Sequence, residues 1–325
     1  MAIAAAIFTV ALGGFGWFAL SMGARGADLV VACAMFSIFF GPCLALSVDR
    51  YRASLRAWLA PAPAIRVGAA SMISLAFYAC YAASQKSSLI SVGKVALYEW
   101  FTIAIVAGWG PAGRRLVDQP GRFALAILAL WLPVELRLVR GLFLPAGANH
   151  GFDLTFFAAL ALGLILVLAV SPVPDIGYSF RLKIGDLARA GLGLAAFAAV
   201  AIPLGLSIGF IVWKPAGFGP LEWVGRALAI YFVTAIPEEL IFRGMVQNLL
   251  EKRWPGRPGR TLLLASVIFG AAHLNNPPAP NWPYMLLASL AGLAYGWVWM
   301  RTRRITASAL THMAVDLIWG ALLHK

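Results

Sequence analysis

The sequence predicts an all-α membrane protein, a polytopic bundle of about eleven transmembrane helices, in a range of roughly 9 to 12. Of the 325 residues, 61% are hydrophobic and only 12% are charged, and the mean hydropathy is +0.82. Soluble domains contain about 25% charged residues. Because this chain has too little polar surface to cover a soluble fold of its length, the bilayer is expected to be its solvent.

About eleven apolar stretches are long enough, or nearly so, to cross the roughly 30 Å hydrocarbon layer. The fifth is interrupted by Pro133, Glu135 and Arg137, and the ninth is short. The stretches run approximately over residues 2–22, 28–48, 67–84, 93–111, 122–140, 154–172, 190–213, 223–250, 261–275, 283–300 and 305–324.

The basic residues alternate between the two sides of this bundle. The net charge is +13, and most Lys and Arg residues fall in every second loop. The positive-inside rule then places the N-terminus in the cytoplasm. Because the charge forms no basic domain or stripe, it indicates contact with the lipid bilayer and no nucleic-acid partner. The Ala/Leu/Arg-rich composition favours a bacterial inner (plasma) membrane.

The best candidate boundary lies in the sixth loop, residues 171–189, which contains Pro172, Pro174 and several charges. The sequence therefore predicts an N-terminal bundle over 1–189, to which it assigns no role, and a second bundle over 190–325. The candidate functional residues all lie in the second bundle.

Two adjacent carboxylates and an arginine interrupt the eighth stretch, which reads IPEELIFRG over residues 236–244. Ionisable residues inside a bilayer are costly and usually have a function or a partner. Glu239 and Arg243 are four residues apart, so they share a helix face and are expected to pair. Glu238 lies about 100° around the helix from Glu239 and does not share its partner, so it is the carboxylate expected to take part in a reaction. Pro237 is expected to loosen or kink the helix.

The ninth and eleventh stretches each add a histidine to this set. Phe269 and His273 are four residues apart, and so are His312 and Asp316. A carboxylate beside an imidazole fixes its tautomer and raises its basicity. A structural ion pair and packed, hydrogen-bonded histidines would explain each group taken alone.

The three groups also lie at matching depth. Counted from the cytoplasmic basic flanks, Glu238, His273 and Asp316 each lie roughly 18 Å along their helices, near the midplane. If these helices pack together, they form one site. Such a set supports hydrolysis, with a glutamate and an imidazole activating water and a second histidine stabilising an oxyanion. The same four residues, Glu238, His273, His312 and Asp316, also suit a zinc ion with an open position, and the spacing does not decide between the two.

The motifs EExxxR at 238–243, FxxxH at 269–273 and HxxxD at 312–316 resemble, in this order, those of the CPBP family. This is the CAAX-processing and bacteriocin-processing (Abi-like) group, which includes the type II CAAX prenyl proteases. The resemblance covers about residues 223–320. It implies that Glu238 activates water with His273, and that His312 and residue 316 form an oxyanion hole.

The eukaryotic and archaeal CAAX enzymes commonly have Asn at this last position, where the chain has Asp316, and aspartate is also common in bacterial relatives. A charged carboxylate cannot donate a hydrogen bond to an oxyanion. Asp316 is therefore expected to be protonated, to orient His312, or to bind a metal. The family is classified among the metallopeptidases, and a metal-free, glutamate-dependent mechanism has also been argued. A bound zinc ion therefore remains an alternative, and no other cofactor is expected.

The expected function is that of an intramembrane endopeptidase acting on a membrane-associated or lipidated peptide or protein precursor. In a bacterium, the substrate would be a peptide pheromone, a bacteriocin or a membrane-bound precursor. Two alternatives remain. One is a non-catalytic scaffold or immunity protein, although a scaffold has no need for the complete acidic and histidine set. The other is a proton-coupled transporter, although the N-terminal half has no matching cluster.

Overall fold

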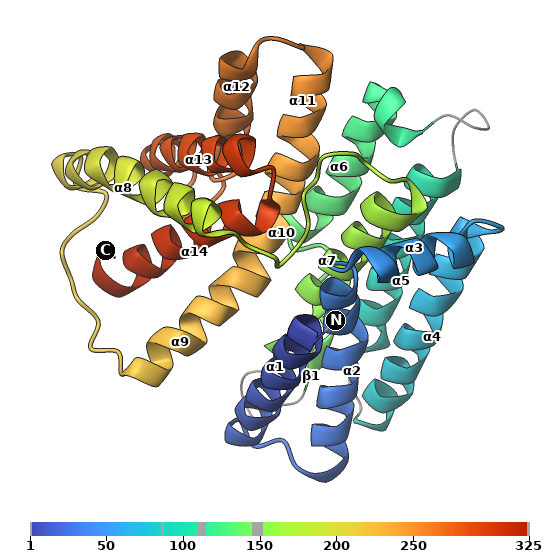
Figure 1. Cartoon of the computed structure of the whole chain (residues 1–325). Helices are drawn as coiled ribbons and strands as arrows, with labels where there is room; N and C mark the ends of the chain where they lie inside the picture. The colour runs from blue at the N-terminus through green and yellow to red at the C-terminus, as the bar shows by residue number, and fades with distance from the viewer. Residues whose placement is uncertain (1, 86–87, 109–114, 145–151, 324–325) are drawn as a thin grey trace. The chain divides into compact units, whose positions relative to one another are not determined.

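The computed structural model describes residues 2–85, 88–108, 115–144 and 152–323 (Figure 1). Helices dominate these residues, which confirms the predicted all-α class. The β-structure among them consists of β1 (Phe143–Leu144) and β2 (Phe152–Asp153), which pair antiparallel with Phe143 opposite Asp153. Each of the apolar stretches predicted from the sequence contains a helix.

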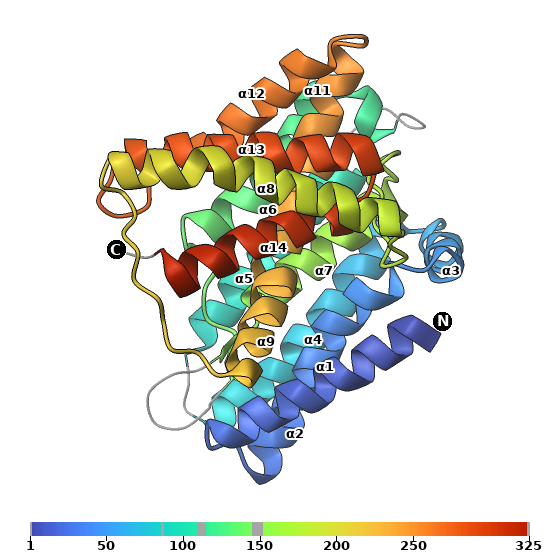
Figure 2. The ribbon, with the colours of Figure 1, turned by 60° about the vertical axis from the view of Figure 1, so that its left-hand side comes forward.

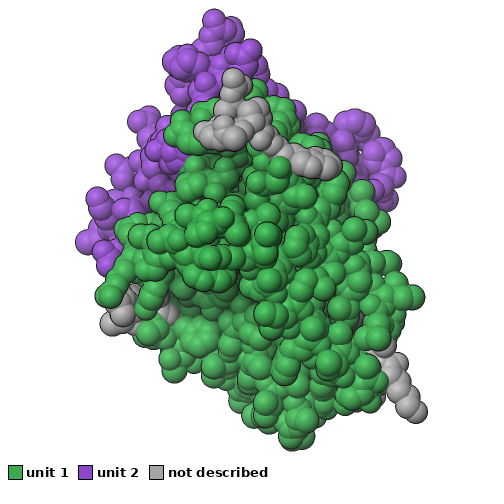
Figure 3. Space-filling model, turned by 90° about the vertical axis from the view of Figure 1, so that its right-hand side faces the viewer, with its two compact units in different colours: residues 1–173 green, residues 174–325 purple. Residues whose placement is uncertain are grey.

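The chain divides into two compact units, residues 1–173 and 174–325, which Figure 3 colours green and purple. The division falls inside the 171–189 loop, where the sequence predicts a boundary between bundles. The functional boundary between residues 189 and 190 stays a prediction.

The helical elements of unit 1 begin with α1 and end with the π-helical segment η3. Its helical elements are α1 (Ala2–Ser21), α2 (Gly26–Ala45), α3 (Asp49–Leu59), α4 (Pro63–Ser84), α5 (Leu89–Ile103), the π-helical η1 (Ala104–Gly108), the short 3₁₀ turn η2 (Leu116–Asp118), α6 (Pro120–Glu135), α7 (Thr155–Ile165) and η3 (Leu166–Val170).

An aromatic cluster joins three helices of unit 1. The ring of Phe36 stacks on Phe15 at 4.3 Å, and Phe157 meets Phe36 and Phe40 edge-on at 5.6 and 5.5 Å. These are favourable aromatic geometries, so α1, α2 and α7 share one core.

The predicted apolar stretches leave residues 49–66 as a loop rich in basic residues, but residues 49–59 of this segment form the helix α3. Charged and apolar residues are interspersed along α3, so it is not one of the long apolar runs from which the other helices were predicted. The fifth stretch also ends early, at Glu135, and Arg137 follows in a left-handed conformation with φ 59°. The helix therefore stops at the interruption that the sequence marks.

Unit 2 contains α8 (Ile184–Ser207), a long broken helix over 220–253, α12 (Pro258–Ala271), α13 (Trp282–Thr302) and α14 (Ile305–Leu322). The broken helix consists of α9 (Pro220–Ala229), the π-helical η4 (Ile230–Ala235), α10 (Ile236–Glu239), the π-helical η5 (Leu240–Gln247) and α11 (Asn248–Arg253). In unit 2, α13 packs against α8, α12 and α14 (Figure 2). The short α10 also packs against α14.

Several helices begin at a proline that the sequence supplies, among them α4 at Pro63, α6 at Pro120, α9 at Pro220 and α12 at Pro258. The first helical position has no backbone N–H partner to lose, and proline already has the helical φ. These prolines therefore start helices rather than break them.

Five helices in the described part of the chain are long and apolar enough to cross a membrane. They are α2, α4, α5 together with η1, α8 and α14, and Ala5–Ser21, Thr155–Val170 and Pro258–Ala271 are apolar but shorter. This agrees with a polytopic helical membrane protein. The number of complete crossings, about eleven from the sequence, stays a prediction.

Glycines bring α12 and α13 close together. A Cβ added to Gly270 would meet the hydroxyl of Ser289 and would stand 2.5 Å from the carbonyl oxygen of Met285. A Cβ on Gly292 would stand 3.0 Å from the Cα of Ser266. Small residues of this kind allow close helix contact within a membrane, and this contact fixes the helices that carry Phe269 and Tyr295.

We expect Gly270→Ala to lower the free energy of unfolding by about 1–3 kcal/mol, because the new methyl group meets backbone that cannot turn away. The measurement is the apparent melting temperature of the purified protein in detergent.

The matched control is Gly191→Ala in α8, where an added Cβ has nothing within 4 Å. It is expected to keep or raise the melting temperature, since alanine favours a helix over glycine by about 1 kcal/mol. Equal melting temperatures for the two variants would contradict the close approach of α12 and α13.

Candidate functional site

The two adjacent glutamates lie where the long helix of unit 2 is irregular. The π-helical segments η4 and η5 flank α10, which has the sequence IPEE. Pro237 has no N–H to continue the α-helical hydrogen bonds, and π-helical turns are frequent at functional sites. The loosening that the sequence predicts at Pro237 therefore takes the form of widened turns before and after the glutamates.

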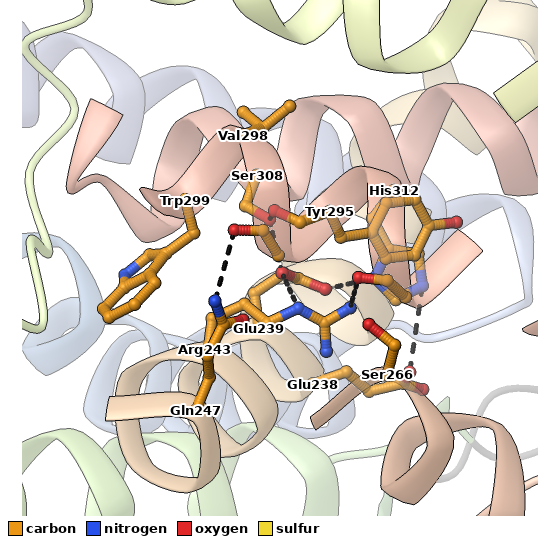
Figure 4. A network of polar contacts seen from close by, with 12 residues as sticks. Glu238, Glu239, Arg243, Gln247, Ser266, Tyr295, Val298, Trp299, Ser308 and His312 are labelled. Carbon is orange, nitrogen blue, oxygen red and sulfur yellow. Dashed lines mark hydrogen bonds and ion pairs between the residues drawn. The ribbon is translucent and has the colours of Figure 1, made fainter. Parts of the chain in front are cut away.

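Glu239 is fully buried and lies between three polar partners (Figure 4). Its carboxylate is 3.2 Å from Nε of Arg243, the pair that the four-residue spacing predicts. The hydroxyl of Ser308 lies 2.5 Å from Oε2, and Nδ1 of His312 lies 3.0 Å from Oε1. Glu239 thus links the broken helix to α14.

Arg243 is as deeply buried as its partner. Its guanidinium lies over the ring of Phe269 at 4.6 Å and near that of Tyr295 at 5.5 Å, and Nη2 donates to the carbonyl oxygen of Gly292 at 3.4 Å. Cation–π contacts gain strength where water is excluded. The arginine therefore ties the ion pair to α12 and α13.

His312 lies at the centre of the cluster, with carboxylates at both ring nitrogens. Its Nδ1 faces Glu239, and its Nε2 lies 3.4 Å from Oδ2 of Asp316 and 3.7 Å from Oε2 of Glu238. The contact with Asp316 matches the helical spacing of the two residues. Of the three roles that the sequence leaves open for Asp316, this geometry favours orientation of His312.

Aromatic rings hold the imidazole of His312 from the sides. Tyr295 stacks on it with a centroid distance of 4.5 Å and an interplanar angle of 14°, and Phe269 meets it edge-on at 5.8 Å. Both rings are buried. The position of the imidazole is therefore fixed by packing as well as by its charged neighbours.

Exposure changes sharply across the cluster. The side chains of Glu239 and His312 are 0% and 3% exposed, whereas those of Glu238 and Asp316 are 31% and 37% exposed. The inner carboxylate and the imidazole are thus enclosed by protein, and the two outer carboxylates lie at the partly exposed edge of the cluster.

His273 does not lie within a helix. The α12 helix ends at Ala271, and the N–H of His273 donates to the carbonyl oxygen of Gly270 in the following turn at 2.9 Å. The Nδ1 of His273 lies 2.9 Å from the carbonyl oxygen of Phe269, and its ring packs against Phe269 and Tyr284, both at 4.8 Å.

The candidate residues from the sequence therefore meet in two groups. Direct contacts join Glu238, Glu239, Arg243, His312 and Asp316. His273 joins this cluster through Phe269, whose ring touches both imidazoles.

Ser308 and Tyr295 belong to the cluster but were not among the candidates. Ser308 precedes His312 by one helical turn, and this four-residue spacing would have been the signal for it. Tyr295 lies in α13 next to Gly296, in a segment whose small residues favour a close helix contact. Its stacking on His312 depends on how α13 meets α14, which no local pattern encodes.

The zinc alternative does not fit this arrangement. Among residues 2–85, 88–108, 115–144 and 152–323, no three His, Cys, Asp or Glu side chains are placed to hold a metal ion. His312 has carboxylates at both nitrogens, and Nδ1 of His273 is occupied by a carbonyl oxygen. These side chains are therefore arranged to contact one another and not a shared metal ion.

The comparison with known families points to the same segment. Residues 220–318 match the model of the type II CAAX prenyl endopeptidase Rce1-like family. The match begins with the first residue of α9 and ends two residues after Asp316, so it contains the whole cluster. No curated protein and no solved structure matches the chain. Over residues 220–318, which carry the ionisable cluster, the chain is therefore similar to the type II CAAX prenyl endopeptidase Rce1-like family.

Proposed function

We propose that the cluster around His312 hydrolyses a peptide bond in a membrane-associated or lipidated peptide or protein precursor, using water activated by Glu238 and His273. The family match supports a CAAX-type intramembrane endopeptidase in general. The roles of the individual residues rest on the contacts within the cluster.

The observation that carries the proposal is the position of Glu238 at the partly exposed edge of an otherwise buried ion cluster. A general base must reach both water and the reacting bond. Glu239, fully buried and paired with Arg243, has no access to water. Glu238 therefore accepts the proton, and Glu239 keeps the structure around it in place.

The hydrogen bonds give the two histidines opposite roles. A backbone carbonyl only accepts, so the bond with Phe269 places the proton of His273 on Nδ1. The Nε2 of a neutral His273 then carries a lone pair and acts as a second proton acceptor. Ionised carboxylates also only accept, so His312 donates from both Nδ1 and Nε2.

The single Nε2–H of His312 can be shared between Asp316 and the carbonyl oxygen of a bound substrate, so it is the donor suited to an oxyanion. A donor held in place before the reaction stabilises developing negative charge without reorganisation. Glu239 holds the Nδ1 side of the ring and Tyr295 holds its face. In this role Asp316 keeps the imidazole oriented and protonated, and does not itself contact the oxyanion.

In the proposed reaction, every proton is transferred between water, Glu238 and the substrate, with His273 and His312 assisting. The water oxygen attacks the carbonyl carbon of the substrate while its proton moves to Glu238, assisted by His273. The carbonyl oxygen becomes an oxyanion beside Nε2–H of His312. The tetrahedral intermediate then collapses, the C–N bond breaks, and Glu238 returns its proton to the leaving amine.

The surroundings favour a substrate that comes from the membrane. The α14 helix, which carries His312 and Asp316, is one of the helices long and apolar enough to cross a bilayer. A site within such helices is reached most easily by a peptide that is anchored at or in the bilayer. This supports a lipidated or membrane-bound precursor as the substrate.

We expect Glu238→Gln to reduce kcat by about 10²–10⁴-fold, the usual contribution of a general base, with the melting temperature unchanged. The assay uses the purified full-length chain in liposomes, with a library of lipidated and plain peptides, and mass spectrometry of the products.

Glu222→Gln is the matched control on the same long helix. Glu222 forms an exposed ion pair with Arg226 at 2.9 Å, four residues away, and lies outside the cluster. It is expected to cleave at the wild-type rate. Full cleavage by Glu238→Gln would refute the proposal. A folded wild-type protein that cleaves nothing across the library would favour the scaffold alternative.

Ser308 is expected to be a positioning residue, because its hydroxyl contacts the carboxylate of Glu239. Ser308→Ala should lower kcat while leaving KM within about twofold, since the substrate does not touch Ser308. A hydrogen bond to a charged group contributes about 1.5–3 kcal/mol, so the melting temperature should also fall.

The control for this change is Ser207→Ala at the end of α8, where the hydroxyl donates to the carbonyl oxygen of Leu204 at 2.8 Å. A rise in KM with unchanged kcat in Ser308→Ala would mean that Ser308 binds substrate instead of positioning Glu239.

A further inference from the structure

Unit 1 contains an ionisable group that the proposed peptidase does not use. Glu99 lies in α5, near the middle of the candidate span Leu89–Gly108. It is about 15 Å from either end of that span at 1.5 Å per residue. The side chain is buried, with the residue 2% exposed. An ionisable residue at this depth is costly and usually functional.

One oxygen of this carboxyl group is engaged by a hydroxyl. Glu99 and Ser71 of α4 share a side-chain hydrogen bond. The other oxygen, Oε2, is buried and has no hydrogen-bond partner among the described residues. The neighbouring polar groups are satisfied by backbone, because Tyr98 donates to the carbonyl oxygen of Leu130 at 3.0 Å and Thr102 to that of Tyr98 at 2.8 Å.

Among the described residues, no Lys or Arg forms an ion pair with Glu99. The helices against α5 are α4, α6 and α7, together with η1. Arg66 of α4 is engaged by the carbonyl oxygen of Trp58, and Arg122 of α6 by those of Ile105 and Val106 at 2.7 and 3.0 Å.

The remaining titratable groups of these elements do not supply a cation either. Glu135 of α6 is hydrogen-bonded with Trp131, and Lys94 of α5 itself is exposed. The tyrosines of α4, Tyr78 and Tyr81, are neutral, and α7 and η1 carry no charged residue.

We infer that Glu99 is a proton-binding site in the N-terminal unit, held as the neutral carboxylic acid at neutral pH. An ionised carboxylate without a counter-charge would cost several kcal/mol in this environment, whereas the neutral acid needs no cation. Glu239 provides the contrast, since it is equally buried but has Arg243, Ser308 and His312 around it.

A neutral buried acid has a distinctive reactivity towards hydrophobic carbodiimides. The carboxyl oxygen bonds to the central carbon of the carbodiimide, and the carboxyl proton moves to one of its nitrogens. The resulting O-acylisourea rearranges by transfer of the acyl group from oxygen to nitrogen, which gives a stable N-acylurea. No leaving group or redox partner is needed, so Glu99 is assigned as a site for such reagents.

The first arm of the test treats the full-length protein in liposomes with dicyclohexylcarbodiimide and maps adducts by mass spectrometry. We expect an adduct on the peptide containing Glu99, none at that peptide in Glu99→Gln, and none at the ion-paired Glu239. An adduct at Glu239 and none at Glu99 would overturn the inference.

The second arm reads the protonation state directly, whether or not the reagent reaches the site. The infrared difference between wild type and Glu99→Gln at neutral pH should show the carbonyl stretch of a protonated carboxylic acid, which shifts in D₂O. Glutamine has nearly the same shape as the neutral acid, so this variant should keep the wild-type melting temperature. A carboxylate stretch in place of the acid band would refute the proposal.

Discussion

The buried charge of Glu239 has to be compensated inside the protein, and the arrangement of the site follows from how this is done. Arg243 supplies the counter-charge from the same helix, Ser308 and His312 supply contacts from α14, and the rings of Phe269 and Tyr295 flank the arginine. Removing one partner from a buried ion pair costs about 3–5 kcal/mol. The carboxylate therefore holds α10 and α14 in a fixed relation, and through the arginine it includes α12 and α13.

This dry interior gives the outer residues their chemical character. Because Glu239 fixes His312 from the inner side, the other nitrogen of the imidazole faces Glu238 and Asp316 at the exposed edge. Glu238 and Glu239 lie about 100° apart around α10, so the two successive glutamates face different environments, one partly exposed and one buried.

Much of this could be predicted from the sequence, for physical reasons. Long apolar runs give helices in every expected stretch, and four-residue spacing gives the pairs Glu239–Arg243 and His312–Asp316. What could not be predicted depends on tertiary contacts or on backbone detail. The turn that carries His273 follows an early end of α12, the stacking of Tyr295 on His312 needs the approach of α13 to α14, and the α3 helix is too charged for an apolar search.

The proposed mechanism requires different protonation states for the two histidines, with a neutral imidazole at His273 and a doubly protonated one at His312. Nitrogen-15 spectra of the histidine side chains in the labelled full-length protein would measure this directly, and the chain contains only four histidines to assign. We predict that His273 carries its proton on Nδ1 with a bare Nε2, and that both nitrogens of His312 are protonated, with the His312 signals altered in Glu239→Gln. A bare nitrogen on His312, or a proton on Nε2 of His273, would contradict the proposed division of roles.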